Sequence, residues 1–160
     1  MTSDKHRNTP VSTDIVIPKE KAVFWLDANG CWRNASGRFR HKKISDHFHA
    51  AIRKDADGFF LYQEREDGTE KVYFPFVDAA LFVFDVALND HVFLTLNTGE
   101  KFLLDPRKLY VQNDNLYVTR GEDRVKFTER SLLMISSLID VDNDAYFIRL
   151  NGRKYRIESR

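Results

Sequence analysis

The sequence contains a single cysteine, Cys31, and therefore cannot form an intramolecular disulfide bond. One unpaired thiol is typical of proteins kept in a reducing compartment, so the sequence predicts a cytoplasmic location. The first twenty residues are polar and lack the apolar segment that a signal peptide requires. The longest apolar runs, 72–77 and 79–84, are far shorter than the ~20 residues that span a bilayer, so we expect no association with a membrane.

The chain also lacks an excess of charge of either sign. Its 25 Lys and Arg residues against 24 Asp and Glu residues give a formal net charge of +1, so no overall field attracts nucleic acid. A Gly-x-Ser-x-Gly nucleophile elbow and a glycine-rich phosphate loop are absent from the sequence. Catalysis by scattered residues stays open, but no motif supports it.

Short apolar segments separated by turn residues predict a strand-rich chain of 160 residues, enough for one ordinary domain or for two very small ones. The expected hairpin turns are Asn29-Gly30, Asp67-Gly68, Thr98-Gly99 and Asn151-Gly152.

Two segments instead carry apolar residues at helical spacing. The first is predicted to continue until the turn at Asp57-Gly58, and the second to begin after Thr128, whose side chain can cap it. The apolar positions are Ile44, Phe48, Ala51 and Ile52 in the first segment, and Leu132, Ile135, Leu138 and Ile139 in the second.

The order hairpin, helix, hairpin occurs twice along the chain. A shift of 87 residues (139 − 52) places Ile52 on Ile139 and Phe48 on Ile135. This match favours a structural repeat, although any two amphipathic helices followed by hairpins could align in a similar way.

The predicted fold class is α+β, with two hairpin-helix-hairpin units joined by a strand-rich middle in mostly antiparallel sheet. One unit alone has too little apolar area to be stable, so the two units are expected to share a core. We predict a disordered arm over residues 1–17, the first α+β unit over 18–80, and the strand-rich middle with the second unit over 81–160.

Several short motifs follow one another in the order found in a known family. They are a Gly-x-Trp turn at Gly30 and Trp32, a strand after an Asp-Gly turn at 57–61, an "EKV" strand at 70–72 and the pair Asp78-Ala79. Together with residues 119–139, they resemble the bacterial domain-of-unknown-function family 1285 (DUF1285) over about residues 23–157. The resemblance implies a repeated α+β motif and a role in regulation or signalling, and it implies no reaction.

One acid, Asp78, lies between the two longest apolar runs. A buried unpaired charge is costly, so Asp78 is predicted to be paired, to cap a turn or to face a site. In one interpretation it accepts backbone hydrogen bonds where the strand bends after Pro75. In the other it belongs to a seam between the two units that faces a polar ligand, together with Trp32, Glu70 and Lys71.

Three further patterns are explained better without a ligand. Asp46 and His49 could chelate one ion from a helix, but two ligands do not close a site, so we predict no metal. The segment "KDADG" at 54–58 lacks a ligand that an EF-hand loop requires and is predicted to be a turn. The basic run at 38–43 could follow a nucleic-acid backbone, but the acidic segment 64–70 and the low net charge favour a solvated, salt-bridged surface.

These residues together predict a non-catalytic cytoplasmic module, without a cofactor, that binds a small polar ligand or a protein partner. The alternative is a small hydrolase-like enzyme that uses Glu70 and Asp78 as an acid/base pair in a cleft between the units. No sequence pattern identifies the ligand, the partner, the pathway or the oligomeric state.

Overall fold

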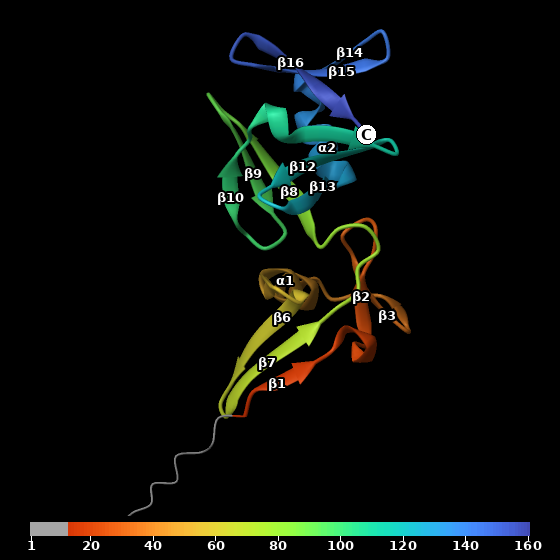
Figure 1. Cartoon of the computed structure of the whole chain (residues 1–160), viewed down its shortest axis with the longest axis vertical. Helices are drawn as coiled ribbons and strands as arrows, with labels where there is room; N and C mark the ends of the chain where they lie inside the picture. Colours follow the sequence, from red (N-terminus) through yellow and green to blue (C-terminus); the bar gives the residue numbers. More distant parts are fainter. Residues whose placement is uncertain (1–12) are drawn as a thin grey trace, which may run out of the picture.

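The chain is divided into two lobes, one above the other in Figure 1. They are seen in a computed structural model that describes residues 13–160. We call residues 13–77 the N-lobe and residues 78–160 the C-lobe. The C-terminus lies in the C-lobe, at the end of the molecule far from the start of the described chain.

The N-lobe consists of two small sheets and one α-helix. One sheet has the strand order β1-β7-β6-β5, and the other has the order β2-β3-β4. The elements in chain order are β1 (Ile15–Ile17), the 3-10 helix η1 (Lys19–Lys21), β2 (Phe24–Leu26), β3 (Trp32–Asn34), β4 (Gly37–Arg38), α1 (Lys42–Ala50), β5 (Ile52–Asp55), β6 (Gly58–Arg65) and β7 (Gly68–Tyr73).

The C-lobe is built on a nine-stranded sheet with the order β10-β9-β8-β13-β12-β11-β16-β15-β14. Its elements in chain order are β8 (Leu81–Leu88), β9 (Val92–Leu96), β10 (Lys101–Leu103), the 3-10 helix η2 (Pro106–Lys108), β11 (Leu109–Gln112), β12 (Asn115–Arg120), β13 (Asp123–Phe127), α2 (Glu129–Ile135), the 3-10 helix η3 (Ser136–Leu138), β14 (Ile139–Asp142), β15 (Ala145–Leu150) and β16 (Arg153–Ser159).

Strand pairing over residues 13–160 is antiparallel except in three pairs, β1–β7, β8–β13 and β11–β16. The predicted strand-rich chain with two α-helices and mostly antiparallel sheet is therefore confirmed. The predicted turn at Asn29-Gly30 lies within the loop that joins β2 to β3.

Both helices end earlier than the sequence predicted, α1 at Ala50 and α2 at Ile135, whereas α2 begins where it was predicted to begin. The side-chain oxygen of Thr128 accepts a hydrogen bond from the Ser131 amide at 3.1 Å, which confirms the predicted cap of α2. Helix α1 ends at Ala50, so its predicted continuation to the Asp57-Gly58 turn is wrong. Ile52 is buried as the helical pattern required, but it pairs with Leu61 in the sheet. A buried residue just after a helix extends the apolar pattern of that helix without belonging to it.

The predicted disordered arm is corrected at its end. Residues 15–17 form β1, which pairs in parallel with β7, and the Asp14 carboxylate accepts a hydrogen bond from the Thr69 hydroxyl at 2.8 Å. Three apolar residues are too few to show a strand period, so their pairing could not be read from the sequence. Residues 1–12 of the predicted arm lie outside the described residues.

The four strands around α1 and the last four strands of the C-lobe sheet have the same order, and the hairpins that follow α1 and α2 have the same register. Ile52 pairs with Leu61 in β5–β6, and Ile139 pairs with Ile148 in β14–β15, which is the same pairing shifted by 87 residues. The orders β1-β7-β6-β5 and β11-β16-β15-β14 each begin with a parallel pair and continue with two antiparallel pairs.

A contiguous cluster of buried apolar side chains runs through both lobes. The lobes pack closely at Gly30 of the β2–β3 turn, where an added Cβ would lie 3.2 Å from the ring of Phe82 in β8. A polar contact lies in the same interface, because His49 Nδ1 of α1 is 3.2 Å from Asn97 Nδ2 of the C-lobe. The interface is therefore packed on this side.

Candidate functional site between the lobes

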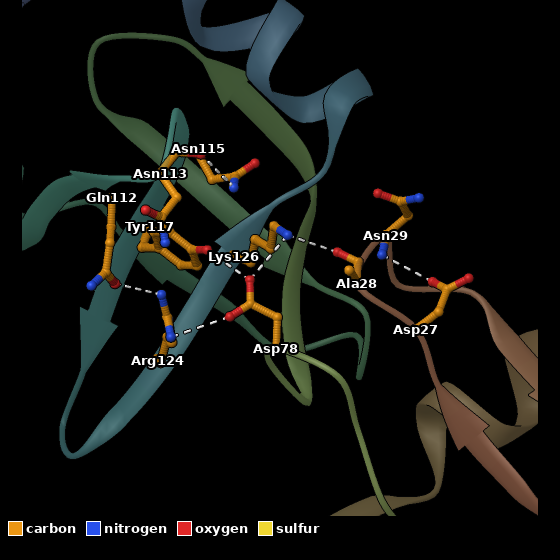
Figure 2. Close-up of polar contacts among 10 residues, drawn as sticks. All are labelled: Asp27, Ala28, Asn29, Asp78, Gln112, Asn113, Asn115, Tyr117, Arg124 and Lys126. Carbon is orange, nitrogen blue, oxygen red and sulfur yellow. Dashed lines mark hydrogen bonds and ion pairs between the residues drawn. The ribbon is translucent and has the colours of Figure 1, made fainter.

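Asp78 lies at the start of the C-lobe and is held by three side chains of that lobe (Figure 2). Its Oδ2 accepts a hydrogen bond from the Tyr117 hydroxyl at 2.6 Å and lies 3.0 Å from Lys126 Nζ. Its Oδ1 lies 3.2 Å from Arg124 Nη1. Pairing, one of the three roles left open for Asp78, is therefore seen, and side chains of β12 and β13 take the place of the backbone amides that the first interpretation proposed.

The surroundings of Asp78 fix its charge. Burial raises the pKa of the Asp78 carboxyl, but hydrogen bonds from Tyr117 and Lys126 outweigh burial and leave that pKa below its ordinary value. Burial and the hydrogen bond to Asp78 raise the pKa of Tyr117 to about 12. Lys126 Nζ also donates to the carbonyl oxygen of Ala28 in the N-lobe at 2.8 Å, so this ion cluster ties the two lobes together.

The other residues of the predicted seam lie in separate places. Glu70 pairs with Arg65 at 3.1 Å, and Lys71 pairs with Asp55 at 3.2 Å, both within the sheet of the N-lobe. The Trp32 side chain is 1% exposed and packs in the aromatic core of the N-lobe. In the part of the chain that the structure describes, no hydrogen bond or ion pair joins any of these three residues to Asp78.

The residues weighed for metal binding have other partners. Asp46 pairs with Lys42 at 2.6 Å, and His49 is buried beside Asn97. Burial lowers the pKa of His49 to about 4, although Asp46 and the Gly30 carbonyl act in the opposite direction. Between residues 13 and 160, no three His, Cys, Asp or Glu side chains gather closely enough to hold a metal ion.

A cleft of about 850 Å³ opens elsewhere between the lobes. On the N-lobe side it is bordered by the end of α1 and by β5 and β6, and on the C-lobe side by β8 and the β9–β10 and β12–β13 turns. Its charged and polar lining residues are Arg53, Lys54, Thr98, Glu100, Arg120 and Asp123.

Four of these charges form two ion pairs. Lys54 of the N-lobe lies 2.5 Å from the carboxylate of Asp123 in the C-lobe, and this hydrogen bond raises the pKa of Lys54. Arg120 pairs with Glu100 across the two turns of the C-lobe. The first pair joins the two lobes at the cleft, and the second connects the β9–β10 and β12–β13 turns on the C-lobe side.

Arg53 is the cation of the cleft that these acids leave unneutralised. Its Nη1 donates to the carbonyl oxygens of Ala50 at 3.0 Å and Ile52 at 2.9 Å, which orients the guanidinium at the end of α1. Among the described residues no carboxylate lies within ion-pair distance of Arg53. Its remaining N–H groups have the planar geometry that binds a carboxylate or a phosphate through two hydrogen bonds.

The cleft also has an apolar wall. Ile52, Phe59 and Leu81 line it, and Lys54 Nζ lies 5.4 Å from the centre of the Phe59 ring. An apolar wall beside an unneutralised guanidinium can hold a small molecule with an apolar body and an anionic group.

The sequence did not point to these lining residues. It placed a turn at Thr98-Gly99, and this turn does border the cleft. Lys54 was weighed in the sequence only as the first residue of a rejected calcium loop, and Arg53 was not singled out. No local signal could show that residues 69 positions apart, Lys54 and Asp123, would meet across two lobes.

The helices give no sign of a membrane segment. No helix in the described range 13–160 is both long enough and apolar enough to cross a bilayer.

Comparison with known proteins finds similarity in structure alone. No protein-family model matches the chain, and no curated protein matches it by sequence. A DUF1285 family protein from Silicibacter pomeroyi DSS-3 superposes with a TM-score of 0.60 at 15% identity, over 96% of this chain and 90% of that one. A DUF1285 family protein from Shewanella baltica OS155 gives a TM-score of 0.51 at 17% identity, over 74% of this chain and 94% of that one. The chain thus has the fold of these DUF1285 proteins, and the distant resemblance indicated by its motifs is confirmed at the level of the fold.

Proposed function

We propose that the chain is a non-catalytic binding module that holds a small organic anion in the cleft between its lobes. The observation that carries this proposal is Arg53, an oriented guanidinium in a cleft of about 850 Å³ with no carboxylate partner in the described chain. Cavities of this size accommodate small molecules, and a few placed polar groups fix the ligand's orientation.

The lining defines the ligand's chemistry. The anionic group, a carboxylate or a phosphate, binds Arg53, and the apolar body packs against Phe59 and Leu81. Because the cleft is bordered by both lobes, a bound ligand touches both and favours one arrangement of them. A module of this kind suits the regulatory or signalling role that the family resemblance implies.

The environments of Glu70 and Asp78 support binding rather than catalysis. Each carboxylate is engaged in ion pairs of its own, and neither lines the cleft. A general acid or base must reach the substrate and exchange a proton with it. An Asp78 carboxylate held by Tyr117 and Lys126 is poorly placed for that role.

Ligand titrations followed by NMR test the proposed site. Benzoate and phenyl phosphate are expected to shift the amide signals of Arg53, Gly99 and Gly121, whereas neutral benzyl alcohol leaves them in place. Arg53→Ala should weaken binding of both anions about tenfold or more, because a hydrogen bond to a charged group contributes about 1.5–3 kcal/mol. Arg107→Ala, which removes an exposed arginine outside the cleft, is the matched control. Equal shifts with benzyl alcohol, or equal binding by Arg53→Ala, would overturn the proposal.

We also propose that the two hairpin-helix-hairpin units are copies of one structural repeat. The shared strand order and the 87-residue register of the Ile52–Leu61 and Ile139–Ile148 pairs support it. Phe48 and Ile135 are then equivalent core positions. Truncation of either side chain to Ala should lower the free energy of unfolding by about 3 kcal/mol. A loss at only one of the two positions contradicts this register.

The cytoplasmic location is part of the same proposal. The single thiol Cys31 supports it, and fractionation of cells that produce the full chain tests it.

A further inference from the structure

A second hollow surface lies on the molecule and shares no lining residue with the cleft. It consists of three adjoining cavities of about 430, 440 and 360 Å³, and Arg38 lines all three. Phe39 and Arg40 also border the first two, and Asn29 and Cys31 border the second and third. We call this surface the basic groove. It extends from β4 and the beginning of α1 to β13 and the beginning of α2 in the C-lobe.

The basic groove concentrates positive charge. Its charged lining comprises six cations against three acids, and because Asp78 outside the lining neutralises Lys126, the local net charge is +2 in a chain whose total is +1. The acids are Asp27, Asp46 and Glu129, and the cations are Arg33, Arg38, Arg40, Lys42, Lys126 and Arg130.

Three of these cations, Arg38, Arg40 and Arg130, have no carboxylate within ion-pair distance among residues 13–160, and Arg130 donates instead to the carbonyl oxygen of Phe84. Asp27 is paired with Arg33 at 2.7 Å, and Asp46 with Lys42. Arg38 and Arg40 are both exposed. The sequence favoured a salt-bridged surface for the basic run 38–43, and for these two arginines that surface is not salt-bridged. The groove is therefore complementary to an anionic partner.

The first cavity adds an apolar pocket to this charge. Its walls include Phe39, Ile44 and Phe48, and Ile44 is 46% exposed. Arg38 and Arg40 border the same cavity. A single bulky apolar side chain in this pocket, with acidic residues on either side of it, would satisfy both features. Interfaces commonly rest on one such apolar anchor surrounded by polar contacts.

The beginning of α1 adds to the positive potential. Its N-cap residue His41 makes no side-chain capping bond, and its first turn contains lysines but no acid. The helix dipole favours negative charge at this end, so an acidic partner side chain would supply what the sequence of α1 omits.

The aromatic rings of the groove distinguish a peptide from nucleic acid. Bases bind single-strand readers by stacking on open ring faces. Here Phe39 and Phe48 pack edge to face at 5.2 Å, and the ring of Trp32 is buried against Phe48. We propose that the basic groove binds an acidic peptide segment of a partner protein, with one bulky apolar residue of that segment in the pocket formed by Phe39, Ile44 and Phe48.

Fluorescence anisotropy with a defined probe tests this assignment. The probe is a labelled synthetic heptapeptide with phenylalanine at its centre and three glutamates on each side, added to the full chain at low salt. The double variant Arg38→Glu with Arg40→Glu should bind about tenfold more weakly or worse, because like charges now face each other. Replacing the central phenylalanine of the probe by alanine should also weaken binding about tenfold.

The control applies the same change of charge elsewhere. Lys19→Glu with Lys21→Glu reverses two exposed cations of η1 that lie outside all three cavities, and it should leave binding unchanged. Circular dichroism verifies that both double variants fold. If both double variants weakened peptide binding equally, binding would depend only on the net charge of the chain, and the proposal would be overturned. Tighter, arginine-dependent binding of oligo(dT) would overturn it in favour of nucleic acid, and arginine-dependent self-association would overturn it in favour of a second copy of the chain.

Discussion

At the scale of single residues, Asp78 and Glu70 show that the burial of a carboxylate's ion-pair partner matters more for stability than the exposure of the carboxylate itself. Their side chains are 20% and 22% exposed, respectively. Asp78 nevertheless neutralises Lys126, whose side chain is only 9% exposed, whereas Glu70 pairs with Arg65, which is 42% exposed. The two carboxylates are therefore similarly buried, but only Asp78 neutralises a buried cation, so their variants can be compared directly.

Asp78→Ala should destabilise the chain by about 2–3 kcal/mol, because it leaves the Lys126 ammonium buried with the neutral Ala28 carbonyl as its remaining partner. Glu70→Ala should cost less than about 1 kcal/mol, since it removes a partly exposed ion pair. Urea unfolding of the two variants measures both values. Asp78→Asn keeps an acceptor for Tyr117 and should be milder than Asp78→Ala. If Asp78→Ala left the free energy of unfolding unchanged, the carboxylate would be retained for a ligand rather than for stability.

His49 predicts how stability depends on pH. Burial lowers its pKa in the folded chain to about 4, against about 6.5 when it is exposed. Between these values the unfolded chain binds the proton and the folded chain does not, so the free energy of unfolding decreases as the pH falls from 6.5 toward 4. The loss should be on the order of 3 kcal/mol, and it should be absent above pH 7.

Unfolding in urea at a series of pH values measures this slope. His49→Gln is the control, because its amide oxygen can accept from Asn97 and does not titrate. A slope of the same size in His49→Gln would assign the effect to other groups. Loss of the Asp78 ion cluster is separate, since a lowered carboxyl pKa acts only below about pH 4.

At the scale of elements, the β2–β3 turn fits against β8 through Gly30. This residue has φ +80°, and a Cβ there would lie 3.2 Å from the buried Phe82 ring. Gly152 has a similar φ of +75°, but no atom lies within 4 Å of its added Cβ. Gly152→Ala should therefore cost about 1 kcal/mol from backbone strain alone, and Gly30→Ala about 1–2 kcal/mol more from displaced packing. Thermal unfolding of both variants tests this difference, and equal costs would mean that the lobes yield freely at this contact.

Local signals predicted the elements whose causes are local. Gly-containing turns placed the β2–β3 and β6–β7 hairpins, and Thr128 placed the start of α2. Strands β1 and β5 were missed because each is short and depends on a partner strand for its conformation. A strand of three or four residues shows no period by itself, so its pairing is information that only the folded chain contains.

The candidate site was less readable than the elements. Asp78 was predicted to be paired, to cap a turn or to face a site, and Tyr117, its hydrogen-bond partner, lies 39 positions away and gave no signal of its own. The cleft and the basic groove both combine residues of two lobes. Sequence patterns report periodicity within one segment, whereas a site between lobes depends on how two segments meet.

At the scale of the whole molecule, the residues that maintain the fold are different from those that form the candidate sites. The DUF1285 fold is recognisable at 15% identity, because patterning of apolar residues is enough to maintain it. Arg53, Arg38 and Arg40 do not serve the core, since all three are exposed. Function depends on such sites rather than on the fold, so the cleft with Arg53 and the basic groove with Arg38 and Arg40 have to be tested in this chain itself.

The lobes should unfold as one unit. Each is small, and small domains bury too little surface to be very stable alone. One apolar cluster crosses between them, and the contacts of Gly30 with Phe82, Lys126 with Ala28 and His49 with Asn97 would all be lost if either lobe unfolded. Calorimetry should therefore show a single transition in which the calorimetric and van't Hoff enthalpies agree.

Hydrogen exchange in the variant Gly30→Ala makes this test specific. If the lobes are coupled, the slowest amides of β6 in the N-lobe and of β12 in the C-lobe should lose protection by the same free energy, because both exchange only through global unfolding. Gly152→Ala acts within the C-lobe and should produce the same equality at a smaller cost. Protection lost in β6 alone would mean that the N-lobe opens by itself. The cleft and the basic groove would then lie between parts that separate in the native state, and ligand binding would have to supply the free energy that holds them together.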